Sequence, residues 1–409
     1  MPSNLTQVQF IAKRVYSSDR VTEHTLRDHV MFNMVTRKTV FGGEDFRYTV
    51  KTGNPQSVSG TFTTAQTQAA AATATGSSKG AQFACQPALK YGVVQIDGPS
   101  LTRLKGNYQS FFDLVTMEFD STLEELGDSL AFDLTHDGSG NRGQRASIAT
   151  NTITLTVPDD ARNFKEGMVI IASANADGST PRVGSSILTA VDEDAGTITM
   201  TLAADITAFA NNDFLFRQGD PATGYDGIAR HLPLTAPVFL SDSFRGVDRG
   251  RNPRRLAGVR VNDPNSPVEE TAGLIGVKIK QSGKSVAGGC AFWNPIRFWE
   301  CVRRLNAKVE YQKAGGTADY GFEYIMIHTP AGTVKAYSDA DIPINRQYVG
   351  KIDSVEIRHL EEFPGPVRDD GKLTDRVSNA DAIEARYRAH SQTIFRVPGE
   401  WGVASLPST

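Results

Sequence analysis

The longest regular pattern of apolar positions in the chain lies between residues 107 and 134. Apolar side chains recur there every three or four positions, which places them along one stripe of an amphipathic helix. At 1.5 Å per residue such a helix is about 42 Å long, which is unusual in a globular domain. The stripe consists of Tyr108, Phe112, Val115, Phe119, Leu123, Leu126, Leu130 and Leu134. The pattern therefore predicts one continuous helix.

Two strand patterns precede this helix. Phe46, Tyr48 and Val50 alternate with polar residues, which is the period of a half-buried strand, and Tyr91–Ile96 is a second apolar run. We expect the second run to be the return partner of the first. The two strands would then form the arms of one hairpin over residues 41–98.

The segment between these strands is almost free of charge. Lys79 is the only charged residue from Thr52 to Leu89, and large apolar residues are few. Such a segment cannot bury enough surface to form its own core. A flexible linker is one interpretation, but the flanking strands favour a projecting hairpin. Phe62 and Phe83 are its candidate anchors on another subunit.

After the helix the composition changes to short β-rich runs separated by Gly, Asp and Asn turns. The runs are Ile153–Val157, Met168–Ile171, Ile187–Val191, Thr197–Leu202 and Phe214–Phe216. Short, evenly spaced strands are typical of a small closed barrel or a sandwich. We expect an inserted β domain at 147–220, with linkers at 138–145 and 221–227.

The last part of the chain mixes helix and strand signals. Asn294 followed by Pro295 is a favourable helix start, because Asn can cap the first turn and Pro fits its first position. The apolar face that follows extends to Val309. Strands are predicted at Tyr320–His328, Gly332–Tyr337, Ser354–Leu360, Ile383–Arg388 and Gln392–Arg396. The predicted fold class is α+β.

Composition limits the classes of function. A chain of 409 residues exceeds one compact core, so two or more lobes are expected. The formal net charge of −3 gives no overall attraction to nucleic acid or to an anionic membrane. Three cysteines (Cys85, Cys290 and Cys301) are too few for a disulfide framework and fit a reducing compartment. We find neither a signal-peptide pattern nor a membrane-length apolar run, and we expect a chain that is cytoplasmic or becomes part of something assembled in the cytoplasm.

The segments that resemble ligand-binding motifs lack the flanking residues or elements that such sites need. Gly138–Gly143 matches G-x-G-x-x-G, but it follows a helix and precedes strands, the reverse of a dinucleotide site. Ser282–Ser285 resembles the end of a phosphate-binding loop, yet Lys278 stands where the first glycine is needed. The seven histidines lack zinc spacing, and the acidic turn at 192–194 lacks a calcium-loop pattern. We predict no catalytic residue, no cofactor and no metal site.

One charge cluster has two open interpretations. Its arginines are Arg245, Arg249, Arg251, Arg254, Arg255 and Arg260, with Asp248 the only acid among them. They either contact phosphates or other subunits, or belong to an exposed loop whose charges are merely solvated. The near-neutral chain favours subunits over nucleic acid within the first interpretation. Arg249, Arg251, Arg254 and Arg255 are therefore candidate contact residues.

The order of these pieces resembles a known family. An arm, a low-charge hairpin, a very long amphipathic helix and a mixed lobe are similar to the tailed-bacteriophage major capsid protein of the Hong Kong 97 type. Local features of the same resemblance are Phe164–Val169, Val191–Thr199, Asn212–Asp220, Asn294-Pro295, Tyr320–Phe322, Asp370-Gly371, Asp381–Glu384 and Gly399–Val403. The first three look like the small β-rich insertion found in many phage capsid proteins.

The resemblance implies a domain plan and a structural, non-enzymatic role. The plan is an N-terminal arm at 1–40, an E-loop hairpin at 41–98, a peripheral domain with its spine helix at 99–146, an inserted β-barrel at 147–220, a mostly axial domain at 221–345, and return strands of the peripheral domain at 346–409. Some relatives join subunits through a Lys–Asn bond. Lys79 lies in the corresponding loop, but neither an acceptor nor a catalytic Glu is identified.

The implied partners follow from this role. They are further copies of the chain in hexamers and pentamers, a separate scaffolding protein, a portal and a decoration protein. The shell would be assembled in the host cytoplasm and would enclose double-stranded DNA without sequence-specific or membrane binding. The alternative is a phage tail or receptor-attachment protein whose barrel binds a receptor or glycan, and an enzyme comes third.

Overall fold

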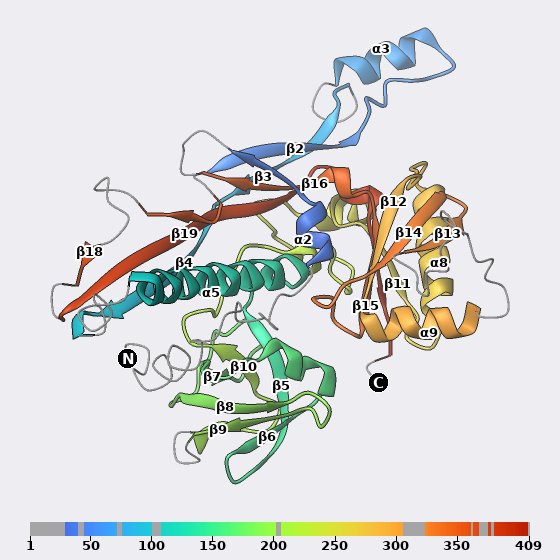
Figure 1. Cartoon of the computed structure of the whole chain (residues 1–409). Helices are drawn as coiled ribbons and strands as arrows, with labels where there is room; N and C mark the ends of the chain where they lie inside the picture. Colours follow the sequence, from blue (N-terminus) through green and yellow to red (C-terminus); the bar gives the residue numbers. More distant parts are fainter. Residues whose placement is uncertain are drawn as a thin grey trace, which may run out of the picture.

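The computed structural model describes residues 29–39, 45–71, 76–99, 108–201, 206–305, 324–360, 363–367, 375–377 and 380–407. These residues form two six-stranded sheets, a closed barrel and a two-stranded hairpin that projects from the body (Figure 1). The structure contains both helices and mainly antiparallel sheets, which agrees with the predicted α+β class. Most of the predicted arm, residues 1–28, lies outside the described residues.

The first sheet is organised around one long strand. Its strands are β1 (Thr36–Thr39), β4 (Ala88–Asp97), β16 (Val355–His359), β17 (Gly365–Pro366), β18 (Asp375–Arg376) and β19 (Ala382–Phe395). β19 pairs antiparallel with β4 along its first part and with β16 along its last part. The two strands predicted at 383–388 and 392–396 are therefore one, because no turn residue interrupts the chain between them. The short helix α2 (Val30–Met34) leads into β1.

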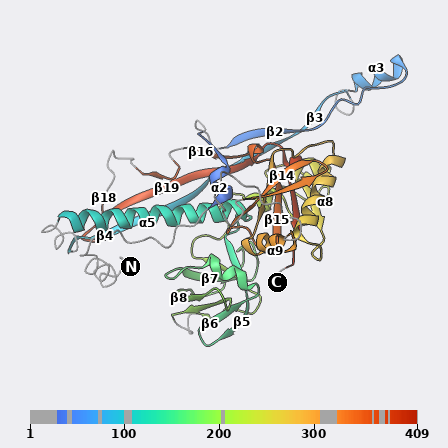
Figure 2. The same ribbon diagram turned by 45° about the vertical axis from the view of Figure 1, so that its right-hand side comes forward.

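The predicted long helix is confirmed as α5 (Tyr108–Thr135). It lies between the first sheet and the barrel (Figures 1 and 2). Leu126, Leu130 and Leu134 from the predicted stripe are buried in the main core, and Phe119 and Leu123 pack against that core. The side chains of residues 108–117 lie outside the described part.

The hairpin differs from its prediction in the return strand. β2 (Phe46–Gly53) pairs antiparallel with β3 (Lys79–Cys85), whereas the run Tyr91–Ile96 belongs to β4 and pairs with β19. β3 was missed because Phe83 is its only large apolar residue. Beyond Gly53 the chain carries a short helix, α3 (Phe62–Ala70), at the tip of the projection (Figure 2). The sequence did not predict this helix.

The second sheet runs in the order β11-β20-β15-β12-β14-β13. Its strands are β11 (Val259–Asn262), β12 (Gly289–Trp293), β13 (Ile325–Thr329), β14 (Gly332–Ser338), β15 (Arg346–Gly350) and β20 (Gly402–Ser405). β13 and β14 confirm two predicted strands, although residues 320–323 lie outside the described part. β15 and β20 come from residues 346–409, the segment expected to supply return strands of the peripheral domain. They lie in the second sheet, apart from β16 and β19 of the same segment, because they pair with each other and with β12 and β11.

Two helices accompany the second sheet. α8 (Val268–Gln281) buries Ile275 and Ile279 in the core of this sheet. α9 (Pro295–Leu305) begins as predicted, because the Asn294 side chain accepts a hydrogen bond from the Ile296 N–H at 2.9 Å. Its predicted extension to Val309 lies outside the described residues. Shorter helices are α6 (Ile228–His231), α7 (Pro253–Leu256) and the 3₁₀ turns η1 (Pro158–Asn163), η3 (Arg249–Arg251), η4 (Ile352–Ser354) and η5 (Pro398–Glu400).

The predicted barrel is present and closes in the order β10-β5-β6-β9-β8-β7. Its strands are β5 (Asn141–Ala149), β6 (Thr152–Leu155), β7 (Val169–Ser173), β8 (Ser186–Asp192), β9 (Thr197–Met200) and β10 (Phe214–Arg217). β5 begins inside the expected linker at 138–145, so that linker prediction is wrong. The strand was hidden because two of its buried positions are Arg142 and Arg145, whose guanidinium groups donate to the carbonyl oxygens of Asn163 and Phe209.

β5 gives a sharp test of the barrel as a folding unit. A fragment of residues 138–222 contains all six strands and is expected to unfold cooperatively, with a β-type circular dichroism spectrum. A fragment of residues 148–220 lacks most of β5, so β6 and β10 lose a partner and the barrel stays open. We expect the shorter fragment to show no cooperative thermal transition. Equal cooperativity in both fragments would contradict a barrel that depends on β5.

Candidate assembly surfaces

The base of the hairpin is anchored in its own subunit. Phe83 is 1% exposed, stacks on Tyr48 with ring centroids 5.0 Å apart, and meets the edge of Phe244 at 6.2 Å. Val50, Val247 and Leu256 complete this cluster. The prediction that Phe83 reaches another subunit is therefore wrong. Both phenylalanines lie in a low-charge segment, and only the pairing of β3 decides which of them turns toward the body.

Arg245 fixes the hairpin to the sheets. Its guanidinium donates to Asp226 Oδ2 and Cys85 Sγ, both at 2.9 Å, and to the Thr393 carbonyl at 3.0 Å. Its own carbonyl accepts the Ala84 N–H at 3.1 Å. Burial, partly opposed by Arg245, raises the pKa of Cys85 to about 11, so its thiol stays neutral. The base of the hairpin is thus a rigid support.

The tip of the hairpin is exposed. Val58 and Phe62 are 86% and 81% exposed, and none of the side chains of α3 is buried. Lys79, at the start of β3, is exposed as well. Phe62 and Lys79 therefore stay candidates for contacts with another subunit. Their exposure fits a surface that its own chain does not use.

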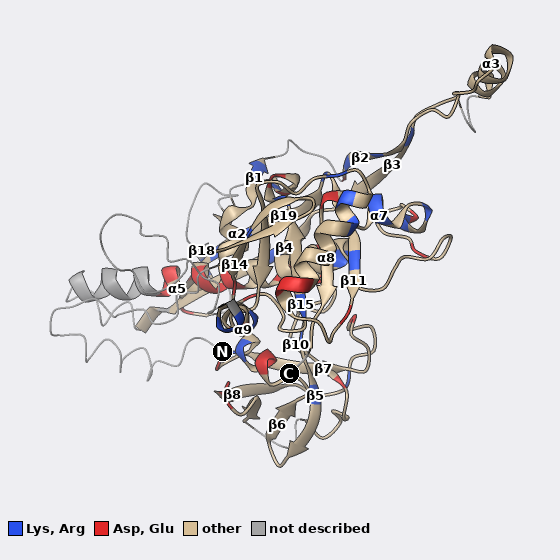
Figure 3. Ribbon diagram, turned by 90° about the vertical axis from the view of Figure 1, so that its right-hand side faces the viewer, with Lys and Arg blue, Asp and Glu red and all other residues tan. Residues whose placement is uncertain are grey.

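The arginine cluster divides into buried and exposed members. Arg249 is buried: it donates two bonds to the Asp242 carboxylate, at 2.7 and 2.9 Å, and one to the Arg230 carbonyl at 2.8 Å. The prediction of Arg249 as a contact residue is therefore wrong, because Asp242, which lies just before the cluster in the sequence, neutralises it. The members that stay candidates are Arg251, Arg254 and Arg255. They are exposed on and beside α7, next to the hairpin base (Figure 3).

A buried ionic junction joins the arm, α5 and the second sheet. His29 lies with Nε2 2.7 Å from Asp128 Oδ1 and Nδ1 2.6 Å from Asp341 Oδ2. Lys165 of the barrel pairs with Glu125 at 2.6 Å and also with Asp128. The sequence did not predict these roles, because the partners are far apart along the chain and meet only in the folded structure.

The pKa of His29 predicts a pH dependence. Burial alone would lower this pKa, but hydrogen bonds and charge attraction from Asp128 and Asp341 outweigh it and raise it from 6.5 to about 10. A histidine whose pKa rises on folding contributes to the stability of the fold. This contribution is complete below the pKa of the unfolded state and is lost as the pH rises through the pKa of the folded state. His29→Gln should therefore be most destabilising at and below about pH 6.5 and approach wild type toward about pH 10. Urea unfolding across this range measures it, and a pH-independent difference would contradict it.

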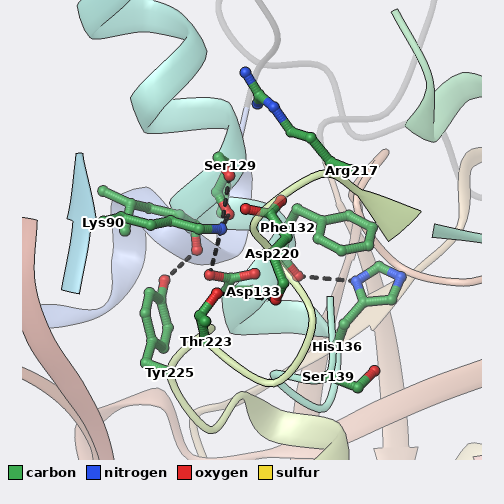
Figure 4. A network of polar contacts seen from close by, with 12 residues as sticks. Lys90, Ser129, Phe132, Asp133, His136, Ser139, Arg217, Asp220, Thr223 and Tyr225 are labelled. Atoms are coloured by element: carbon green, nitrogen blue, oxygen red, sulfur yellow. Dashed lines mark hydrogen bonds and ion pairs between the residues drawn. The ribbon is translucent and has the colours of Figure 1, made fainter. Parts of the chain in front are cut away.

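A second buried ion pair links the first sheet to α5. Lys90 of β4 lies 2.6 Å from Asp133 Oδ2 and donates to Ser129 Oγ at 2.7 Å (Figure 4). The side chains of Lys90 and Asp133 are 11% and 2% exposed. Burial, opposed by Lys90, raises the pKa of Asp133. Lys90 is thus the counter-ion that allows a carboxylate at this depth.

The two segments that resemble ligand-binding motifs are turns at the ends of helices. Ser282 caps the C-terminus of α8 and Gly283 has a left-handed φ of 71°, so carbonyl groups rather than N–H groups face this turn. Gly138 and Gly140, also left-handed, form the tight turn between α5 and β5. Within the described ranges, no group of three or more His, Cys, Asp or Glu side chains is placed to hold a metal ion.

The two remaining cysteines lie in the hydrophobic core. Cys290 and Cys301 are buried free thiols, and burial raises their pKa values to about 11 and about 12. Both are thus thiols of the core. Among the helices that the structure describes, none is long and apolar enough to cross a membrane.

Comparison with known proteins identifies the fold. No protein-family model and no curated protein sequence matches the chain. A chain of the cyanophage A-1(L) capsid asymmetric unit superposes with a TM-score of 0.57 at 11% identity, over 96% of both chains. The chain has the fold of a phage capsid protein.

Two weaker likenesses accompany this capsid fold. The capsid of the native GTA particle gives a TM-score of 0.47 at 10% identity, covering 97% of this chain and 98% of that one. The holo-SrpI encapsulin complex from Synechococcus elongatus PCC 7942 gives 0.46 at 10% identity, covering 100% and 97%. The fold assignment rests on the cyanophage chain. It agrees with the capsid resemblance seen in the sequence.

Proposed function

We propose that this chain is the major capsid protein of a tailed phage, a structural subunit of an icosahedral shell around double-stranded DNA. The capsid fold along 96% of the chain supports this proposal. It is a non-enzymatic role, consistent with buried thiols and with charged groups that serve as internal ion pairs.

The observation that carries the proposal is the hairpin. Its base is fixed by Arg245 and the Phe83 cluster, yet residues 54–71 and 76–78 extend past the body with Val58 and Phe62 exposed. A monomer gains nothing from such an extension. A shell subunit gains a contact with its neighbour, and low charge lets the tip lie on another surface without desolvating unpaired ions.

The parts of the Hong Kong 97-type plan can be assigned on this basis. β2, α3 and β3 correspond to the E-loop, α5 to the spine helix, and α5 with the first sheet to the peripheral domain. The second sheet with α8 and α9 corresponds to the axial domain, and the barrel to the insertion domain. The N-terminal arm, proposed at residues 1–40, ends in β1, which joins the first sheet by pairing with β16. Hexamers and pentamers of this chain would build the shell in the host cytoplasm.

Other partners follow from the same role. A separate scaffolding protein, a portal and a decoration protein are expected, as is DNA held without sequence-specific contacts. Assembly is expected to need no metal or nucleotide. The alternative of a tail or receptor-attachment protein has no observation in its favour.

Electron microscopy of the expressed protein tests the proposal. The full chain, alone and with the products of neighbouring genes, should form isometric particles in negative stain and sediment as a large, uniform species. Tubes or rods would indicate a tail protein. A subunit that stays monodisperse and small under every condition would refute a shell function.

A further inference from the structure

A loop beside the hairpin base presents three consecutive large apolar residues to solvent. Val238, Phe239 and Leu240 are 64%, 58% and 77% exposed; we call these three residues the knuckle. Single exposed apolar residues are normal on a protein surface. Three adjacent ones of this size, all more than half exposed, mark a surface that something else covers.

The knuckle is held rigidly. Leu240 has a left-handed φ of 63°, a conformation that a bulky residue adopts only when its surroundings enforce it. Asp248 holds Leu240 in this conformation, since its Oδ2 accepts a hydrogen bond from the Leu240 N–H at 3.0 Å. The N–H groups of Ser241 and Asp242 both donate to the Val238 carbonyl at 3.2 Å.

Two further contacts within the subunit fix the backbone of the knuckle. The Asp242 carboxylate accepts hydrogen bonds from Nε and Nη2 of Arg249, so its charge is neutralised within the subunit. Gly250 packs so closely that a Cβ there would lie 2.3 Å from the Phe239 N atom. Side chains displayed on such a fixed backbone lose little conformational freedom when they bind. The knuckle is therefore pre-organised for a contact.

The position of the knuckle connects it to the hairpin. A groove of about 650 Å³ separates the two, lined by Gly53 and Lys79 of the hairpin and by Leu240, Asp248 and Arg251 of the loop. Arg255 of α7 also contacts the hairpin, donating to the Thr52 carbonyl at 2.8 Å. The knuckle and the hairpin base thus belong to one continuous flank of the molecule.

We infer that the knuckle is a docking surface for a second copy of this chain, a proposal that rests on the shell function above. In a ring of identical subunits each copy uses one flank toward one neighbour and a different flank toward the other. The hairpin leaves the body on the flank of the knuckle, so the copy that the hairpin reaches is the copy that faces the knuckle. The uncharged knuckle can be buried there without desolvating an ion.

Charge substitutions at the knuckle test this surface. Phe239→Asp places a carboxylate where an apolar contact is proposed, whereas Val183→Asp is a matched control at an 84% exposed valine of the barrel. Both variants should match the thermal unfolding of wild type as free subunits, because both positions are exposed. Light scattering and sedimentation should then show that Phe239→Asp raises the concentration needed for assembly about tenfold or more, as for an interface hot spot.

The control variant and wild type distinguish a failure of the knuckle interface from a failure of the shell function. Val183→Asp should assemble like wild type. If Phe239→Asp also assembles like wild type, the knuckle is not an interface, while the shell function stands. If wild type itself forms no particles in any condition, the shell function fails and the knuckle proposal falls with it.

Crosslinking identifies what covers the knuckle. A photoreactive benzoylphenylalanine at position 239, in particles built from mixed isotope-labelled and unlabelled chains, should give crosslinks between labelled and unlabelled peptides. Crosslinks confined to residues 1–28 of the same chain, or to a scaffolding protein, would overturn a second copy as the occupant.

Discussion

Replacing residues 54–78 by a two-residue Asn-Gly turn is expected to abolish shell formation while leaving the subunit folded. The pairing of β2 and β3 ends at Gly53 and Lys79, where a two-residue turn can close the hairpin. The base cluster of Phe83, Tyr48 and Phe244 would be retained. Only the exposed tip would be lost, and with it the proposed contact to the neighbour.

Measurements on the free subunit and on assembly separate these effects. Circular dichroism and thermal unfolding of the variant should match wild type, and negative stain should show no closed particles. Limited proteolysis adds a second readout: in free wild type the first cuts should fall within 54–78, and particles should protect the same segment. Residues 79–85 should resist cleavage in both states, because β3 is paired with β2 and Phe83 is packed on the body. Normal shells from the shortened variant would refute the role of the tip.

Lys90→Met is expected to destabilise the subunit by about 3–5 kcal/mol, since it leaves the buried Asp133 without its counter-ion. The methionine keeps the apolar stem, so the loss is mainly that of charge pairing. Urea unfolding of the unassembled subunit at neutral pH measures the change. Lys38→Met is the matched control. Lys38 is 46% exposed, and Glu356 keeps Arg396 at 2.9 Å, so the expected loss is below about 1 kcal/mol.

The deficit of Lys90→Met should shrink as the pH falls. Burial already raises the pKa of Asp133, and Lys90 opposes that rise, so removing Lys90 raises the pKa further. A carboxyl group whose folded pKa lies above its unfolded value binds its proton more readily in the folded state. Acid therefore favours the folded variant relative to neutral pH. A deficit that stays constant or grows in mild acid would show that the buried charge is not its cause.

The hairpin shows where sequence reasoning reached its limit. Alternation placed β2 correctly, but it assigned the return strand to Tyr91–Ile96 because that run is more apolar than the true partner, Lys79–Cys85. Strand pairing depends on contacts that are distant in sequence, such as β4 with β19. Hydrophobicity along the chain records that a strand exists and not which strand it joins.

The candidate contact residues divide for the same reason. Phe62 is exposed and Phe83 buried, although both belong to one low-charge segment. Arg251 is exposed, while Arg249 two positions earlier is buried against Asp242. Residue type gave the chemistry of each candidate. Tertiary contacts decided which candidates are buried, namely the pairing of β3 for Phe83 and the ion pair with Asp242 for Arg249, and composition does not reveal them.

The sequence by itself determined the elements whose signal is local. The stripe of α5 repeats within one helix, the Asn294 cap lies beside Pro295, and five of the six barrel strands carry recognisable apolar runs. Only the tertiary structure decided which strands pair, that β5 completes the barrel with buried arginines, and that β15 and β20 join the second sheet. It also placed Lys90 against Asp133 and His29 between two carboxylates. Helix periodicity is fixed by neighbours three and four positions apart, whereas sheet order and buried ion pairs depend on residues that meet only after the chain has folded.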